Sequence, residues 1–340
     1  MKKTFKNIAR DKQANYFAEK YGIKEFGTVR RKPTGYPEAK DFKVKALLKW
    51  EDAKDGKIFY EGYRQQILDE IERRKAAGSY APSALMMCHA LRSEHMPWNI
   101  FYPMSLSDDM KNHAKDIFNA ILEKVSPTSK KIKEIIKIWI EFAPKDETAK
   151  EEPFTQCYLN DRTSFDTYIE YIAEDGEKGG IGIEVKYTEK GYQPGEKEKK
   201  ATIIDYKNPK YRYLDVMKKS GYFIPKAFKR EETGLRAWSP LVRNELRQIW
   251  RNHLLGASMV QHEDLKYFLS LLVYPKGNTH FNGDKTHNGA VRNYKQWLSP
   301  DGQKTWKAIT FEELFQLIQE NYTDPEGTAW VNYLKERYLF

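Results

Sequence analysis

The sequence predicts a globular protein of the mixed α/β (α+β) class, because strand patterns fill the middle of the chain and helical patterns flank them. Hydrophobic residues make up 40% of the 340 residues, which excludes global disorder. No run approaches the roughly 20 apolar residues of a membrane span, and the first residues lack the apolar core of a signal peptide. We therefore expect a soluble, cytoplasmic protein with no membrane partner.

The chain is basic, with 58 Lys and Arg residues against 48 Asp and Glu residues and a net charge of +10. This charge favours a polyanionic partner but does not separate nucleic acid from other anionic surfaces. The two cysteines, Cys88 and Cys157, form neither a metal-type pair nor a disulfide framework, so we expect both to be reduced and partly buried. Nothing in the sequence predicts a zinc site.

The N-terminal part predicts helices after an irregular start. Residues 1–45 are polar and rich in Lys, Gly and Pro, as expected of an irregular arm. The first helical pattern rests on three apolar residues at helical spacing, Tyr63, Ile67 and Ile71, and ends at Gly78. A second helical pattern begins at Ala84 and meets Pro97, and a third covers 107–124.

The segment IKEIIKIWIEFAP, 132–144, alternates as a strand does, with Ile135, Lys137, Trp139 and Glu141 on the face opposite Ile136, Ile138, Ile140 and Phe142. A β-hairpin follows over 163–189, since two β-branched and aromatic runs flank a turn near residue 175. Antiparallel pairing around that turn brings together residues whose numbers sum to about 350. Asp166 is therefore expected opposite Glu184.

The next segment, 190–237, is a charged insertion that contains a short helix at 214–220. After it comes an amphipathic helix that is expected to start at Ser239-Pro240 and to end near Gly256.

The apolar run YFLSLLVYP predicts a buried strand, and the tail predicts two helices, the first with a capping box of Thr310 and Glu313. We divide the chain into an N-terminal arm and helix (1–80), a core (81–280) and a helical C-terminal extension (281–340).

Glu184 and Lys186 share one face of the strand GGIGIEVKYTE. Alone, they are consistent with a solvated ion pair on an edge strand, worth well under about 1 kcal/mol. The hairpin register adds Asp166 and so places two carboxylates and a lysine together. A hairpin ion cluster without catalytic function is the alternative.

The element order is helix, strand, strand with Asp, strand with Glu-x-Lys, helix, strand. This order, with SEHMPWNIFYPM, SFDTYIEY, GIGIEVKYTE and QIWRNHLL, resembles the PD-(D/E)XK nuclease superfamily, and more narrowly a group of bacterial proteins assigned to it. The resemblance covers roughly residues 80–280. It implies a restriction-endonuclease-like core, a central mixed sheet flanked by helices. Phe165 replaces the proline that precedes the aspartate in the family motif, so that half of the motif is incomplete.

By this resemblance Asp166 and Glu184 bind a metal ion and Lys186 is the catalytic lysine. The backbone carbonyl of Val185 is a third candidate ligand. Hydrolysis of a phosphodiester needs a hard cation that neutralises phosphate charge and lowers the pKa of the attacking water. Mg²⁺ prefers carboxylate and carbonyl oxygens as ligands, and Mn²⁺ is a candidate substitute for it.

Five further residues are candidates for the site. Glu94 resembles the acidic residue on the helix before the core strands; the alternative is an exposed turn residue. Gln248 and Arg251 resemble a glutamine-bearing helix that lines some active sites of the superfamily, and Arg251 could hold a phosphate. The alternative for Gln248 and Arg251 is a role at the surface or in core packing. Lys199 and Lys200 fit a nucleic-acid backbone or, alternatively, a solvated loop.

These features predict a Mg²⁺-dependent nuclease that acts on nucleic acid, with DNA the expected substrate. One alternative is a nuclease-fold protein that binds nucleic acid without cleaving it. Another is a glycosidase with two carboxylates, which needs no lysine and leaves the positive charge unexplained. The sequence leaves open the strandedness of the substrate and the oligomeric state, a homodimer included.

Overall fold

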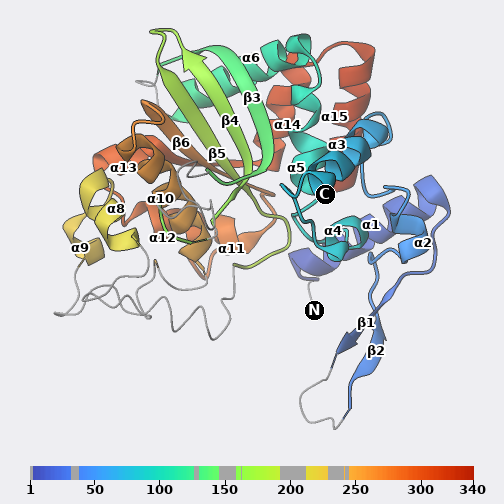
Figure 1. Ribbon diagram of the computed structural model, residues 1–340. Coiled ribbons are helices and arrows are strands. Elements are labelled where there is room, and N and C mark those ends of the chain that lie inside the picture. Colours follow the sequence, from blue (N-terminus) through green and yellow to red (C-terminus); the bar gives the residue numbers. More distant parts are fainter. Residues whose placement is uncertain are drawn as a thin grey trace.

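The computed structural model has a five-stranded sheet at its centre, with strand order β3-β4-β5-β6-β7 (Figure 1). The structure describes residues 3–31, 38–125, 130–144, 158–161, 163–191, 212–228, 241 and 245–340. The strands of the central sheet are β3 (Ile132–Phe142), β4 (Phe165–Ala173), β5 (Lys178–Val185), β6 (Tyr267–Tyr274) and β7 (Trp306–Thr310). Strands β3, β4 and β5 pair antiparallel, whereas β5–β6 and β6–β7 are parallel, so the sheet is mixed, as predicted.

Helices cover both faces of this sheet (Figure 1). One hydrophobic core joins the sheet to the N- and C-terminal helices α1 (Phe5–Tyr21), α3 (Arg64–Ala76), α4 (Ala84–Cys88), α5 (Met96–Ile100), α6 (Asp108–Val125), α14 (Phe311–Asn321) and α15 (Pro325–Tyr338). A second core, on the other face, is built on α8 (Tyr213–Ser220), α9 (Pro225–Phe228), α10 (Arg247–Gln261), α11 (Thr279–Asn282) and α12 (Ala290–Lys295).

The remaining elements are short. They are a hairpin that projects from the body in Figure 1, two further helices and a 3-10 turn: β1 (Thr28–Arg31), β2 (Lys40–Lys43), α2 (Trp50–Ala53), α13 (Pro300–Thr305) and η1 (Pro103–Ser105). None of the described helices is long and apolar enough to cross a membrane.

The predicted hairpin is confirmed in type and in register. Thr167 pairs with Ile183 and Tyr168 with Gly182, so the numbers of opposed residues sum to 350. The chain reverses through Gly176, whose positive φ of 86° favours a residue without a Cβ atom. Because the register is fixed here, alternate residues of β4 and β5 face α10.

The predicted strand 132–142 is confirmed, but its alternation is not. Irregularities in the β3–β4 pairing fall between Ile132 and Glu134 and between Ile135 and Lys137. A bulge shifts the side chains that follow it to the other face. Ile135 is therefore buried, whereas Ile136, which was expected on the face of the other isoleucines, is 42% exposed.

The prediction of an irregular arm over residues 1–45 is wrong. Helix α1 occupies much of this segment, starting after the N-cap Thr4 and ending at Gly22, which has a positive φ of 70°. Its buried residues recur at helical spacing: Ala9, Gln13, Tyr16 and Phe17. The prediction of an irregular arm rested on the polar, lysine-rich composition of the segment and not on this spacing.

Two predicted helices begin or end elsewhere. The helix expected from Ala84 stops at Cys88, and Pro97 lies in the first turn of the separate helix α5, where a missing N–H costs nothing. Helix α10 begins at Arg247 and continues past Gly256; the predicted start, Ser239-Pro240, lies outside the described residues. Gly256 is required by close packing against β6 and does not end the helix, since a Cβ atom there would come within 1.8 Å of the Phe268 ring.

The helices at 64–76, 108–125 and 213–220 and the buried strand β6 are confirmed. The capping box of Thr310 and Glu313 is present at the start of α14, and α15 contains the last predicted helix. Cys88 is a free, partly buried cysteine, whereas Cys157 lies outside the described residues. Strand β7 and the short helices α11 to α13 were not predicted.

Candidate active site

The two carboxylates and the lysine predicted from the hairpin lie on the face of β4 and β5 that α10 covers. Thr167 pairs with Ile183, and Asp166 directly precedes Thr167 on β4 while Glu184 directly follows Ile183 on β5. The Val185 N–H donates a hydrogen bond of 2.7 Å to Asp166 Oδ2. Lys186 Nζ donates to one oxygen of Glu184. The structure therefore brings Asp166, Glu184 and Lys186 together.

This group is buried, which contradicts the alternative of a solvated ion pair on an edge strand. Strand β5 lies between β4 and β6, and Glu184 and Lys186 are only 3% and 6% exposed. The Lys186 N–H donates to the Val273 carbonyl at 2.9 Å, which extends the pairing with β6 past the end of β5. Asn278 Nδ2 donates to the Tyr187 carbonyl at 2.8 Å and fixes the segment beyond the lysine.

The burial and the shared charge perturb the acids and the lysine. Burial, followed by the charge of Glu184, raises the pKa of Asp166 well above its ordinary value. Burial acts to lower the pKa of Lys186, but the charges of Glu184 and Asp166 outweigh it and raise that pKa. The lysine is thus held as an ammonium ion, so it can orient or stabilise an anion but is a poor base.

Glu141, at the end of β3, is a third carboxylate that the sequence did not single out for the site. Its φ of 52° is rare for a residue with a side chain, and such strain persists only where the surroundings hold it. Arg74 donates to the carbonyls of Ile140 and Glu141, and the Ser164 hydroxyl donates to the Glu141 carboxylate at 3.3 Å. Burial, and then the charge of Glu184, raises the pKa of Glu141 to about 7.

Glu94 lies in a turn between α4 and α5, so its predicted place on a helix is wrong. Its carboxylate accepts hydrogen bonds from Ser83 at 2.6 Å and from Arg92, and its side chain is 32% exposed. The charge of Glu94 contributes to the raised pKa of Glu141, although burial and Glu184 contribute more. Glu94 therefore lies at the side of the site that Glu141 occupies.

Of the residues predicted on α10, Arg251 donates through Nε to Asp161 Oδ2 at 2.9 Å. Gln248 is half-buried one turn earlier in the same helix. Instead of either residue, Asn252 contacts the acids, since its Nδ2 donates to the Glu184 oxygen that Lys186 does not occupy. Lys199 and Lys200 lie outside the described residues.

The sequence did not identify Asn252, because the three-residue spacing of Gln248 and Arg251 favoured Arg251, the residue before it. We expect Asn252→Ala to weaken binding of Mn²⁺ or Mg²⁺ by about 10- to 100-fold, as when a partner that orients a metal ligand is removed. The shift of the thermal unfolding midpoint with ion concentration measures this. Gln261→Ala, on the same helix but bonded to the Val216 carbonyl, is the matched control. Equal ion affinity in both variants would remove Asn252 from the site.

The residues fit a hard divalent cation by their chemistry, although no three His, Cys, Asp or Glu side chains within the described ranges form a group that could hold an ion. Burial, and after it the charge of Glu184, raises the pKa of both Asp166 and Glu141, so a cation bound among these carboxylates would offset their mutual repulsion. Asp166 and Glu184 supply two carboxylates, and the carbonyl of Val185 is a third oxygen on the same strand end.

The raised pKa of Glu141 predicts a pH-dependent stability in metal-free buffer. Its carboxyl binds a proton more tightly in the folded than in the unfolded chain, so the stability is present below about pH 4.5 and is lost as the pH rises to about 7. Asp166 changes stability in the same direction. Urea unfolding at pH 5 and pH 8 should therefore show a smaller loss for Glu141→Gln than for the wild type. An unchanged loss would mean that Glu141 does not face these charges.

Comparisons with known proteins identify one family. The family model for the PD-(D/E)XK nuclease superfamily matches residues 2–340, which extends well beyond the segment that carried the sequence resemblance. Searches of curated proteins and of solved structures found no match.

Proposed function

The chain belongs to the PD-(D/E)XK nuclease superfamily, and on this basis we propose that it is a metal-dependent nuclease that hydrolyses phosphodiester bonds, with DNA as its substrate. One observation carries the proposal: Asp166, Glu184 and Lys186 lie together on neighbouring strands, with Glu184 and Lys186 buried. Two acids and a cation are the residue types that this chemistry needs.

Asp166, Glu184 and the Val185 carbonyl would hold Mg²⁺ or Mn²⁺. When bound, the ion withdraws electron density from phosphate oxygens and makes a nearby water more acidic. Lys186, kept protonated by the two acids, orients the attacking water or stabilises the charge that develops on the phosphate. Asn252 holds the orientation of Glu184. Glu141 and Glu94 add carboxylates at the edge of the site.

One observation favours the alternative of a protein that binds nucleic acid without cleaving it. Both carboxylate oxygens of Glu184 accept hydrogen bonds, one from Lys186 and one from Asn252, so a cation must compete for them. The raised pKa of the other acids favours the nuclease, because a cation would relieve their repulsion.

Incubation with end-labelled single- and double-stranded DNA and RNA tests the proposal. We expect cleavage of at least one substrate with Mg²⁺ or Mn²⁺ and none with EDTA. Binding without cleavage in either metal would favour the alternative. Cleavage that persists in EDTA would contradict the metal dependence.

A further inference from the structure

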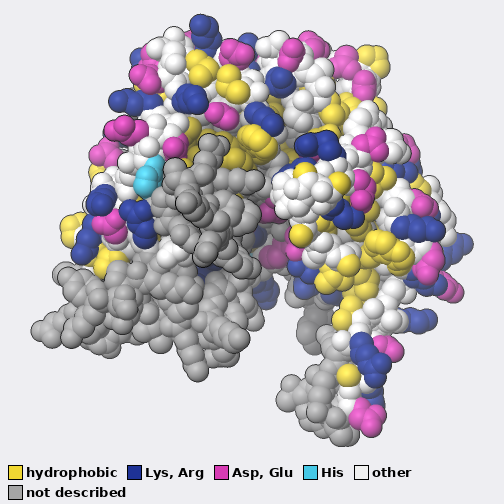
Figure 2. Space-filling model, in the orientation of Figure 1, with side chains coloured by type: hydrophobic (Ala, Val, Ile, Leu, Met, Phe, Trp, Pro, Cys, Tyr) yellow, Lys and Arg dark blue, Asp and Glu magenta, His cyan; other side chains and the backbone are white. Residues whose placement is uncertain are grey.

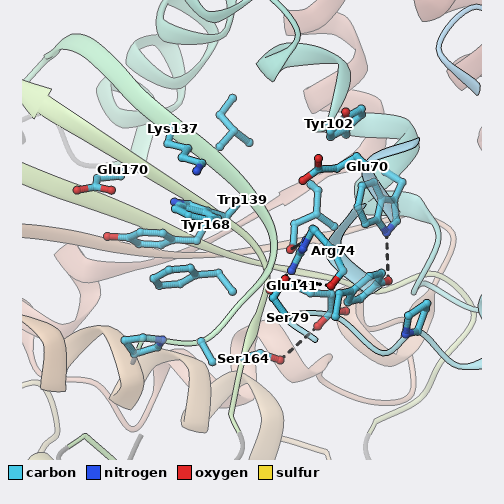
Figure 3. Close-up of a pocket in the computed structure, with 18 of the residues that line it drawn as sticks. Glu70, Arg74, Ser79, Tyr102, Lys137, Trp139, Glu141, Ser164, Tyr168 and Glu170 are labelled. Carbon is cyan, nitrogen blue, oxygen red and sulfur yellow. Dashed lines mark hydrogen bonds between the residues drawn. The ribbon is translucent and has the colours of Figure 1, made fainter. Parts of the chain in front are cut away.

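A groove follows β3, the outer strand of the sheet in the described chain, and reaches the acids of the candidate site. It has a volume of about 1100 Å³ and lies between the sheet on one side and α3, α4 and α5 with their connecting loops on the other (Figure 3). Its lining includes Glu141, Ser164 and Glu94, so it is continuous with the acidic edge of the site. We call it the β3 groove.

Aromatic rings form one wall of the β3 groove. Trp139 and Phe142 of β3 are partly exposed, and their ring centroids are 5.7 Å apart. Phe142 is stacked on the buried Tyr168 of β4, with ring centroids 4.4 Å apart, which holds it in place. Figure 3 shows Trp139 and Tyr168 side by side on the sheet. Such ring faces are platforms on which nucleobases stack regardless of sequence.

The groove is lined by charges of both signs, and only some of its cations form ion pairs with its acids. Among the described residues, the groove carboxylates of Glu70 and Glu170 pair with Arg73 and Lys178. Lys137, which is exposed, lies opposite Glu170 in the β3–β4 pairing but forms no ion pair with a described carboxylate. Its Nζ lies 3.5 Å from the centroid of the Trp139 ring. In Figure 2, hydrophobic side chains over the sheet are interspersed with both basic and acidic side chains.

Arg74 is a second cation without an ion pair in the described part of the chain. Its guanidinium donates to the carbonyls of Ile140 and Glu141, which are neutral groups. The groove therefore combines exposed ring faces with two cations, and it ends at the acids.

We propose that the β3 groove binds a single strand of nucleic acid, with bases on Trp139 and Phe142 and phosphates near Lys137 and Arg74. A duplex turns its bases inward and cannot offer them to these rings, whereas an unpaired strand can. The long side chain of Lys137 can leave the indole face for a phosphate when a base replaces it. The proposal rests on the proposed nuclease function for the chemical step and adds the substrate class.

The test is fluorescence anisotropy in EDTA with labelled oligothymidylate, oligouridylate and a duplex of the same length. We expect tighter binding of a single strand than of the duplex, and the two oligomers identify which sugar is preferred. Trp139→Ala should weaken single-strand binding by about tenfold or more, whereas Trp139→Phe should keep most of it. Trp50→Ala, at an exposed tryptophan outside the groove, is the matched control.

Lys137→Ala is a second variant for the case that Trp139→Ala fails to fold, because this side chain is exposed. It should weaken binding and reduce the slope of log affinity against log salt by about one. Equal affinity for single strand and duplex, or unchanged single-strand affinity in Trp139→Ala and Lys137→Ala, would contradict the proposal that the β3 groove binds a single strand.

The two proposals fail separately. If the protein cleaves duplex and both groove variants leave this cleavage unchanged, the proposed role of the β3 groove is contradicted and the proposed nuclease activity is retained. Single-strand binding that depends on Trp139, without cleavage in Mg²⁺ or Mn²⁺, would refute the nuclease and support the groove.

Discussion

Replacement of Lys186 with methionine is expected to lower the rate of metal-dependent cleavage by on the order of 10²- to 10³-fold, the usual effect of removing one group that stabilises transition-state charge. Methionine keeps much of the side-chain volume but has no ammonium group. Single-turnover cleavage at saturating enzyme measures the effect without a contribution from substrate affinity. A variant that cleaves at the wild-type rate would exclude Lys186 from the mechanism.

The same substitution should also destabilise the metal-free protein. Glu184 would lose its buried ion-pair partner and Asp166 a nearby positive charge, and breaking a buried ion pair from one side costs about 3–5 kcal/mol. A divalent cation should restore part of this loss. Thermal unfolding in EDTA and in Mg²⁺ separates the two effects, and a variant as stable as the wild type in EDTA would show that the pair is solvated.

Asp166→Asn has the largest expected effect on ion binding. Asparagine can still accept the hydrogen bond from the Val185 N–H, so the local backbone should be retained. The charge that binds the cation is lost. In the wild type, an ion at 100 times its dissociation constant stabilises a protein by about 2.7 kcal/mol. We expect this stabilisation to disappear in the variant, together with cleavage.

In metal-free buffer, Asp166→Asn should be more stable than the wild type near neutral pH. The pKa of Asp166 is raised in the folded chain, so ionising it costs stability as the pH rises above its ordinary value of 3.8. An amide does not ionise. Glu170→Gln is the matched control, since Glu170 lies on the same face of β4 and pairs with Lys178. If both variants respond to Mg²⁺ as the wild type does, Asp166 is not a ligand.

The sequence predicted the parts of the site that depend on local rules. The turn near residue 175 fixes the register of the hairpin, and the register alone places Asp166 beside Glu184. The sequence could not reveal that Lys186 is buried, because the elements that bury it, β6 and α10, are more than 60 residues away in the chain.

The parts that were missed depend on contacts between distant segments. Glu141 is held in its strained conformation by Arg74 of α3 and faces acids on other strands, so no spacing within β3 identifies it. Helix α1 was missed for a similar reason. The polar residue in its buried stripe, Gln13, donates to the Arg337 carbonyl of α15, at the other end of the chain. Without that partner, a buried glutamine looks like a surface residue.

The most direct measurement of the central claim compares cleavage of labelled DNA and RNA, each as single strands and as duplexes, by the wild type and by Asp166→Asn in Mg²⁺. The account predicts that the wild type cuts at least one of these substrates, that EDTA stops the reaction, and that Asp166→Asn does not cut although it folds. Cleavage by Asp166→Asn at the wild-type rate would contradict the account, because the reaction would then not depend on the acids of β4 and β5.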